Sequence, residues 1–392
     1  MEILFRDIKK HLGTIDWFLV ICVFIAMGFG FLAIRSATNV FNIDARLGNQ
    51  TRNLIVQAFA MFLGVTGMFI LSKSDYMHIL KYCKYLYLLS VVMLAVVLIF
   101  GVGDEVGNRS WLRFGPVGIQ PSEFAKLALI MTVANHLDKN KKNINHPKNI
   151  IILCVYLLIP FGLILAAGDL GNNLIYGFIF VSMCFVSGIS LWYFLGGAFV
   201  LTASLPLLWN WERLMPAYRR DRIMRGFDPT LDPDGVGFQA RRSMEAIRSG
   251  GLFGQGYQQG QITQWRVPGR IPEQWTDFIF SAIGEEFGFV GAVFVLIILT
   301  LIIMRILVIS RRARNNAGSL VCAGVMSMFI AQTVVNIGMN LGMLPVIGVT
   351  LPLFSYGGSS VLSLLLSIGL VLSVNSRRNI YYFMRDENLD KY

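Results

Sequence analysis

Long apolar runs recur along the whole chain, and they constrain its fold more than any other feature. A helix needs about 20 consecutive apolar residues to cross the hydrocarbon core of a bilayer. Charged residues make up 15% of the chain, against about 25% in an ordinary soluble domain. We therefore expect an all-α integral membrane protein, folded as a single polytopic domain over residues 1–392. The ten predicted transmembrane helices are 15–37, 54–72, 80–101, 120–137, 149–168, 171–189, 191–209, 277–309, 318–341 and 349–374.

Basic residues divide the loops between these helices into two sets. Lysines and arginines gather in alternate loops, as at Lys73, Lys139 and Arg311, while the short loops between them hold few. Because cytoplasmic loops carry the excess of basic residues, both termini are predicted to be cytoplasmic. The run at 277–309 is too long for one straight crossing, so we expect it to tilt or to leave the bilayer at its first turns.

The overall charge and the cysteines exclude several other classes of protein. The formal net charge is +11, but the basic loops that set the topology account for most of it, and we expect no nucleic-acid partner. The five cysteines lie in or beside apolar runs and form no CxxC pair, which argues against a disulfide framework and against a zinc site.

One large loop, residues 210–276 between the seventh and eighth helices, is predicted to be extracytoplasmic. It contains ten arginines and no lysine. A solvated basic loop is one interpretation. The other is an anion site, because guanidinium groups bind phosphate and carboxylate in a bidentate way that lysine cannot match. Within this loop, residues 237–250 have the pattern of a short amphipathic helix that can lie in the membrane interface.

Histidine chemistry is not expected at the outer face. The predicted topology puts all four histidines on the cytoplasmic side or at its edge, which leaves carboxylates, arginines and hydroxyls for catalysis outside. Among the carboxylates, Asp277 opens a predicted transmembrane helix. It is either a helix-terminal aspartate stabilised by the dipole or, at the boundary between water and lipid, a general base.

Further polar groups lie at the ends of predicted helices or inside them. Trp111 and Asp169 lie at the ends, while Lys126, Glu285 and Glu286 fall within apolar spans. Charges inside a membrane are costly and are candidates for function. The alternative is a buried structural ion pair.

At these residues the sequence resembles the SEDS family, the RodA and FtsW proteins of bacterial elongation, division and sporulation. The resemblance extends over nearly the whole chain. It rests on eight short blocks in order, at 108–112, 120–126, 168–171, 237–239, 249–254, 276–280, 284–288 and 351–360. Residues 15–17 lean towards RodA and residues 336–340 towards FtsW, and RodA is slightly favoured.

The resemblance implies a peptidoglycan glycosyltransferase in the bacterial inner membrane with an extracytoplasmic active site. Such an enzyme polymerises lipid II into a growing glycan strand, with inversion to a β-1,4 linkage and undecaprenyl pyrophosphate as the leaving group. A class B penicillin-binding protein, a transpeptidase, is the expected protein partner. The family's essential acidic residue corresponds to Asp277, which would be the catalytic base, and Trp111 is a further important position.

The remaining site predictions concern substrate and leaving group. We expect loop arginines or a divalent cation, Mg²⁺ or Mn²⁺, to stabilise the departing pyrophosphate. The residues predicted to bind substrate are Trp111, Lys126, Asp169, Arg213, Arg219, Arg248, Glu285 and Ser355. The alternatives are a lipid II flippase, for which buried charges would line a translocation path, and a non-catalytic scaffold for a transpeptidase.

Overall fold

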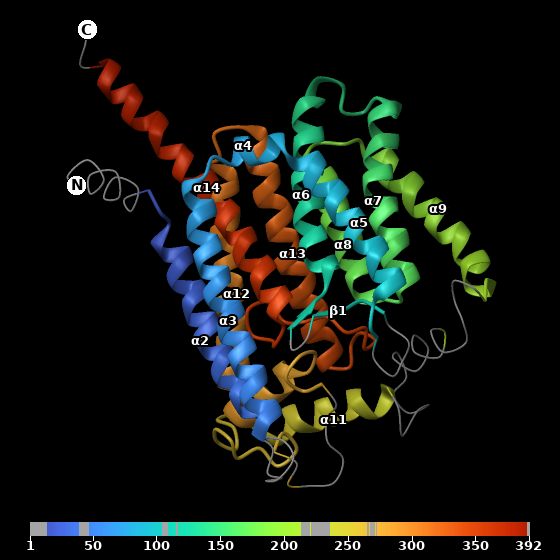
Figure 1. Ribbon diagram of the computed structural model, residues 1–392, viewed down its shortest axis with the longest axis vertical. Helices are drawn as coiled ribbons and strands as arrows, with labels where there is room; N and C mark the ends of the chain where they lie inside the picture. Colours follow the sequence, from blue (N-terminus) through green and yellow to red (C-terminus); the bar gives the residue numbers. More distant parts are fainter. Residues whose placement is uncertain are drawn as a thin grey trace.

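The protein is built almost entirely from helices, as predicted (Figure 1). The computed structural model describes residues 14–38, 47–103, 109–114, 117–212, 220, 236–264, 266, 271 and 273–389. The long helices are α2 (Trp17–Thr38), α3 (Leu47–Lys73), α5 (Cys83–Phe100), α6 (Pro121–Lys139), α7 (Pro147–Ala167), α8 (Leu170–Val186), α9 (Leu191–Asn210), α12 (Ile279–Arg311), α13 (Asn316–Asn340) and α14 (Gly358–Leu389). The shorter elements are α4 (Tyr76–Lys81), a 3₁₀ turn (Lys141–Asn143), α11 (Val236–Ser249) and a hairpin of β1 (Leu112–Phe114) and β2 (Val117–Ile119).

Each predicted transmembrane range overlaps one of the long helices. Seven of the described helices are long and apolar enough to cross a membrane, namely α2, α3, α5, α7, α12, α13 and α14. The helix α8 has only 17 residues, and α6 is interrupted by charged side chains. The protein is therefore a multi-pass membrane protein, while the count of ten crossings stays a prediction.

The helices α13 and α14 form the centre of the bundle. Within their apolar windows 83% of the residues are buried, whereas the figure is 22% for α3, α5 and α7. The outer helices therefore present most of their apolar side chains to the surroundings, as lipid-facing helices do. Polar side chains on α13 are enclosed by protein, so they need hydrogen-bond partners within the bundle and can fix the backbone of neighbouring segments.

The two ends of the bundle differ in character (Figure 1). At one end, the Tyr76 hydroxyl of α4 donates to Asn315 Oδ1 (2.7 Å), and Arg377 Nη2 donates to the carbonyl of Lys73 (3.3 Å). This end therefore gathers basic residues that were predicted to be cytoplasmic. The opposite end carries α11, which belongs to the predicted extracytoplasmic loop.

The last predicted span differs from the structure at its start. Residues 349–357 do not continue a helix, and α14 begins only at Gly358. Leu353 has a left-handed backbone with φ of 67° directly after Pro352, and the Leu351 N–H bonds to Ser355 Oγ (2.8 Å) rather than to a helical carbonyl. A buried loop thus replaces the first turns of the predicted helix.

The long run at 277–309 is interrupted. The helix α12 has a non-helical backbone at Gly288, with φ of 66° and ψ of −162°, a combination open almost only to glycine. A Cβ at this position would collide with the backbone nitrogen of Gly254 in the large loop. The first turns of α12 are therefore set off from the rest, and the loop packs into the break.

Replacing Gly288 by alanine is expected to destabilise the protein by at least about 1–3 kcal/mol, because both the backbone conformation and the space exclude a Cβ. Thermal unfolding of the purified protein in detergent measures the effect. Gly177→Ala on α8 is the matched control, since nothing lies within 4 Å of its Cβ position. Equal melting temperatures for Gly288→Ala and wild type would contradict the inferred clash.

Candidate active site

Asp277 lies in the turn of residues 273–278 that leads into α12, and it is half-buried. Its main-chain carbonyl accepts two hydrogen bonds, from Asn336 Nδ2 and Asn340 Nδ2, both at 2.9 Å. Its carboxylate lies against Gly348, whose Cβ position would be 3.3 Å from Asp277 Oδ2. The backbone of Asp277 is thus fixed from α13, and its side chain faces the loop that follows α13.

The two asparagines on α13 were not predicted as site residues. Both are fully buried and lie one helical turn apart, so their amides point to the same side. Asn336 also donates to the carbonyl of Val349 (2.7 Å), and Asn340 Oδ1 accepts from the Ser281 N–H (3.1 Å). The signal in the sequence was a pair of amides inside an apolar span, which is costly unless the amides are bonded.

Ser355 joins the loop after α13 to the turn that holds Asp277. Its hydroxyl donates to the carbonyl of Thr276 (2.6 Å), and the neighbouring Tyr356 N–H donates to the carbonyl of Trp275 (2.8 Å). Ser355 is buried. These contacts give it a positioning role beside Asp277, and its predicted contact with substrate stays a prediction.

Asp169 is the centre of a second polar cluster. It precedes α8 and accepts hydrogen bonds from the Asn172 N–H (3.0 Å), from Asn172 Nδ2 (2.8 Å) and from Gln120 Nε2 (2.9 Å). Burial raises the pKa of the Asp169 carboxyl, and the bonds from Asn172 and Gln120 and the charge of Lys126 act against that rise. The cluster therefore ties the start of α6 to the start of α8.

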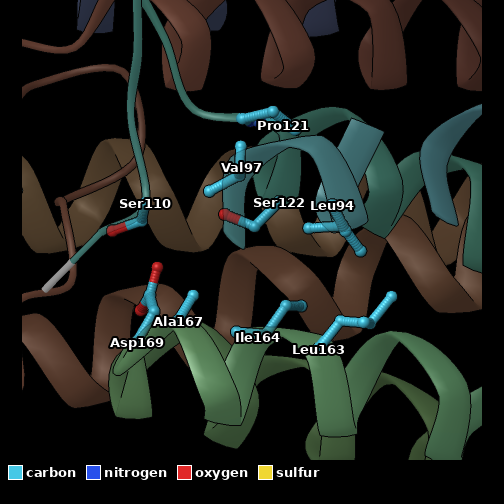
Figure 2. A pocket seen from close by; sticks show the side chains of 9 residues that line it. All are labelled: Leu94, Val97, Ser110, Pro121, Ser122, Leu163, Ile164, Ala167 and Asp169. Atoms are coloured by element: carbon cyan, nitrogen blue, oxygen red, sulfur yellow. The ribbon is translucent and has the colours of Figure 1, made fainter. Parts of the chain in front are cut away.

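A small cavity lies beside this cluster. Figure 2 shows Ser110, Ser122 and Asp169 on its polar side, with apolar side chains such as Leu94 and Leu163 completing the wall. Its volume is about 10 Å³. That is room for about one water molecule and excludes a sugar as its occupant.

The second cluster is connected to Asp277 through a glycine. A Cβ on Gly171, in the first turn of α8, would lie 2.5 Å from the carbonyl oxygen of Ile347 and 3.0 Å from that of Gly348. Gly348 in turn faces the carboxylate of Asp277. Glycine at position 171 thus allows the loop after α13 to pack against the first turn of α8, which follows Asp169.

Lys126 forms a buried ion pair. Its Nζ lies 2.7 Å from Glu123 Oε1 one turn earlier on α6, and both side chains are nearly inaccessible. Ser363 on α14 donates to the other oxygen of Glu123 (3.2 Å). The structure therefore shows Lys126 in a buried ion pair, and its contact with substrate stays a prediction.

Glu285 has a different kind of partner. Its carboxylate accepts the backbone N–H groups of Ile262 (2.8 Å) and Thr263 (2.7 Å), and also the hydroxyl of Thr263. Glu286 accepts from Ser36 (2.6 Å) and from Gln264 Nε2 (2.9 Å). The two carboxylates hold the second half of the large loop against α2 and α12, and the predicted substrate contact of Glu285 stays a prediction.

Trp111 lies at the base of the β1–β2 hairpin, an element that was not predicted. Its carbonyl accepts from the Val102 N–H (2.9 Å), and its ring lies 3.1 Å from the Cβ position of Gly118. Ser359 fixes the hairpin to α14 by accepting from the Gln120 N–H (3.2 Å) and donating to the carbonyl of Gly118 (3.4 Å). Trp111 is half-buried, and its predicted contact with substrate stays a prediction.

The arginines predicted to bind pyrophosphate are only partly observed. Arg213 and Arg219 lie outside the described residues. Arg248 is exposed on the last turn of α11, the amphipathic helix that was predicted at 237–250 and is confirmed at Val236–Ser249. Ser243 on the buried side of α11 donates to the carbonyl of Asn340 (2.8 Å), which ties the helix to the asparagine pair behind Asp277.

No cluster of three or more histidine, cysteine or acidic side chains suited to a metal ion occurs within the described residues. The five cysteines all carry free thiols in this structure.

Comparisons with known proteins agree with this arrangement. Residues 16–380 match the family described as "Cell cycle protein", FtsW/RodA/SpoVE. The chain is 38% identical to "Peptidoglycan glycosyltransferase MrdB" of Escherichia coli K12 over 302 residues, 76% of this chain and 79% of the relative. It is 34% identical to "Stage V sporulation protein E" of Bacillus subtilis over 366 residues, 92% of this chain and 96% of the relative.

A solved structure gives the same result for the fold. A chain from a peptidoglycan synthase complex, described as coordinating polymerization and crosslinking, superposes with a TM-score of 0.77. It is 32% identical, and the match covers 93% of this chain and 98% of the other. With both the sequence and the fold matched over nearly their full length, the chain belongs to the FtsW/RodA/SpoVE family.

Proposed function

We propose that this chain is a peptidoglycan glycosyltransferase that polymerises lipid II into glycan strands. The observation that carries the proposal is the placement of Asp277, whose backbone is held by two buried asparagines while its carboxylate faces the loop at Gly348. The curated name of the MrdB relative supports the same activity.

Asp277 would act as the general base. Its carboxylate would take the proton from a sugar hydroxyl of the acceptor as that oxygen attacks the anomeric carbon of the donor. The bond from the anomeric carbon to the pyrophosphate oxygen breaks, and the configuration inverts to a β-1,4 linkage. Holding the base in one orientation favours such a step, because misplacement of a reacting group by about 1 Å can cost a factor of about 100.

The undecaprenyl pyrophosphate that leaves carries negative charge that must be stabilised. Arg248 is exposed on α11 and makes no ion pair with a carboxylate of the described chain, so its guanidinium is available to a phosphate. A divalent cation, Mg²⁺ or Mn²⁺, is the other source of positive charge. A chelator in the assay distinguishes the two.

We further propose that this chemistry takes place on the extracytoplasmic face of the bacterial inner membrane, with both termini in the cytoplasm. A class B penicillin-binding protein is the proposed partner, which would crosslink the strands that this chain makes. The structure from a complex that combines polymerization and crosslinking supports such a partner. The matched family includes RodA, FtsW and the sporulation proteins, so the slight preference for RodA stays a prediction.

The test is polymerisation by the purified full chain in lipid nanodiscs, supplied with fluorescent lipid II, with and without the transpeptidase and with EDTA. A ladder of glycan products on a gel is the expected result. Absence of polymer under all conditions, together with passage of labelled lipid II across liposomes that contain the protein, would instead identify a flippase.

Asn336→Leu is expected to lower kcat for polymerisation by about 10–100-fold with little change in KM, because the carbonyl of Asp277 loses one of its two donors and the loop at Val349 is released. Steady-state rates at several lipid II concentrations measure both constants.

The matched control for this variant is Gln332→Leu, one turn earlier on the same buried helix, where Gln332 Oε1 has no hydrogen-bond partner among the described residues. It should retain the wild-type kcat. An equal loss of kcat in both variants would show that any substitution in this part of α13 disturbs the protein. It would contradict a specific role of Asn336 in positioning Asp277.

A further inference from the structure

The tip of the large loop carries two exposed apolar side chains. Leu252 is 66% exposed and Phe253 is 81% exposed. Glycines flank them on both sides, and Gly251 and Gly254 have left-handed backbones with φ of 56° and 80°. A sharp turn therefore presents a Leu-Phe pair outward. Adjacent large apolar side chains exposed together mark a surface for another molecule or for a membrane.

The tip is fixed at one place on α12. The Phe289 N–H donates to the carbonyl of Gly251 (2.9 Å), and the Val290 N–H donates to the carbonyl of Leu252 (3.1 Å). These are the first two residues after the break at Gly288, whose glycine lets the loop backbone approach. Leu252 and Phe253 therefore lie at about the same depth in the membrane as Phe289 and Val290.

That depth follows from the length of the helix. The continuous part of α12 runs from Phe289 to Arg311, and at about 1.5 Å per residue it is about 34 Å long. The hydrocarbon core of a bilayer is about 30 Å thick. With the exposed Arg311 and Arg312 at the other surface, Phe289 and Val290 lie at the outer edge of the hydrocarbon.

The surroundings of the tip are those of a membrane interface. Phe289 and Val290 are themselves exposed, and the exposed apolar stripe continues along α12 through Leu296 and Ile297. On the other side, the Tyr257 hydroxyl donates to the carbonyl of Leu32 near the end of α2 (3.3 Å). Tyrosine is common at membrane–water interfaces, because its ring can contact lipid while its hydroxyl reaches polar groups.

We propose that Leu252 and Phe253 insert into the outer leaflet of the membrane and anchor the large loop at a fixed depth. The occupant of this surface is lipid, because the pair is level with the end of the hydrocarbon and continuous with the lipid-facing stripe of α12. The same loop is bonded through Ile262 and Thr263 to Glu285, so an anchor at the tip also fixes the height of the loop above the bundle.

The experiment measures membrane depth directly with a nitroxide label on the full chain in vesicles of phosphatidylethanolamine and phosphatidylglycerol. The five native cysteines are replaced, and single labels are attached after Phe253→Cys, after Gln261→Cys as an exposed position on the same loop, and after Ile297→Cys as a mid-span reference. Collision rates are measured with oxygen, which concentrates in hydrocarbon, and with a neutral nickel chelate, which stays in water.

The expected result is a ratio of oxygen to nickel collisions at position 253 that is several-fold above that at position 261 and below that at position 297. A ratio at position 253 equal to that at position 261 would mean that the tip lies in water and would overturn the proposal. Exclusion of both reagents from position 253 would mean that protein covers the tip, and it would overturn the proposal as well. The measurement needs no catalysis, so its outcome is independent of the proposed activity.

Discussion

Asp277→Asn is expected to lower the rate of glycan polymerisation by a factor of about 10²–10⁴, the usual contribution of a positioned general base. The asparagine has nearly the same shape as the aspartate but cannot take a proton from the acceptor hydroxyl. The measurement is the initial rate of glycan formation from fluorescent lipid II by the purified variant in nanodiscs.

The structure predicts that this variant folds normally. The hydrogen bonds from Asn336 and Asn340 go to the main-chain carbonyl of residue 277 and not to its carboxylate, so they survive the substitution. The melting temperature should therefore stay close to that of the wild type. A fall in rate without a fall in stability separates a catalytic role from the role of a helix-terminal aspartate, which would affect stability instead.

A matched control is Glu245→Gln on α11. Glu245 is an exposed carboxylate in the same loop and pairs with Arg242 (2.6 Å). A surface pair contributes about 0–1 kcal/mol, and the amide oxygen of the introduced glutamine can still accept from Arg242, so this variant should polymerise at nearly the wild-type rate. Polymerisation by Asp277→Asn at the rate of this control would show that the base is another residue.

The helices were predictable because each is specified locally. An apolar run of sufficient length leaves the backbone in lipid no alternative to a helix, and each predicted range overlaps one of the long helices. The amphipathic helix α11 was predictable for a similar reason, since its pattern of apolar and basic residues is complete within 14 residues.

The features that were not predicted depend on contacts between distant segments. The break at Gly288 exists because the loop backbone at Gly254 occupies the space of a side chain. The loop at 349–357 takes its shape from Ser355, which bonds to Thr276, a residue far away along the chain. No local pattern encodes such contacts.

The predicted site residues that the structure describes do not gather at one place. Ser355 lies beside the turn of Asp277, whereas Lys126 and Asp169 belong to the cluster between α6 and α8. The sequence motifs identified these residues but did not indicate how far apart they lie in the folded protein. The asparagine pair was not predicted because amide side chains neither transfer protons nor act as nucleophiles. Their role is to position the main-chain carbonyl of Asp277.

Lys126→Met is expected to destabilise the protein by about 3–5 kcal/mol, because it leaves the charge of Glu123 buried without its partner. Thermal unfolding in detergent measures the loss. The single variant cannot assign a role to Lys126 in substrate binding, since a protein that unfolds also stops polymerising.

The double variant Glu123→Gln, Lys126→Met separates the two roles. It removes both charges, and the amide oxygen introduced at position 123 can still accept from Ser363, so most of the lost stability should return. If polymerisation returns with stability, Lys126 serves only the ion pair. If the double variant melts like the wild type but polymerises far more slowly, one of the two charged groups acts on the substrate. A melting temperature of Lys126→Met equal to that of the wild type would contradict the buried pair itself.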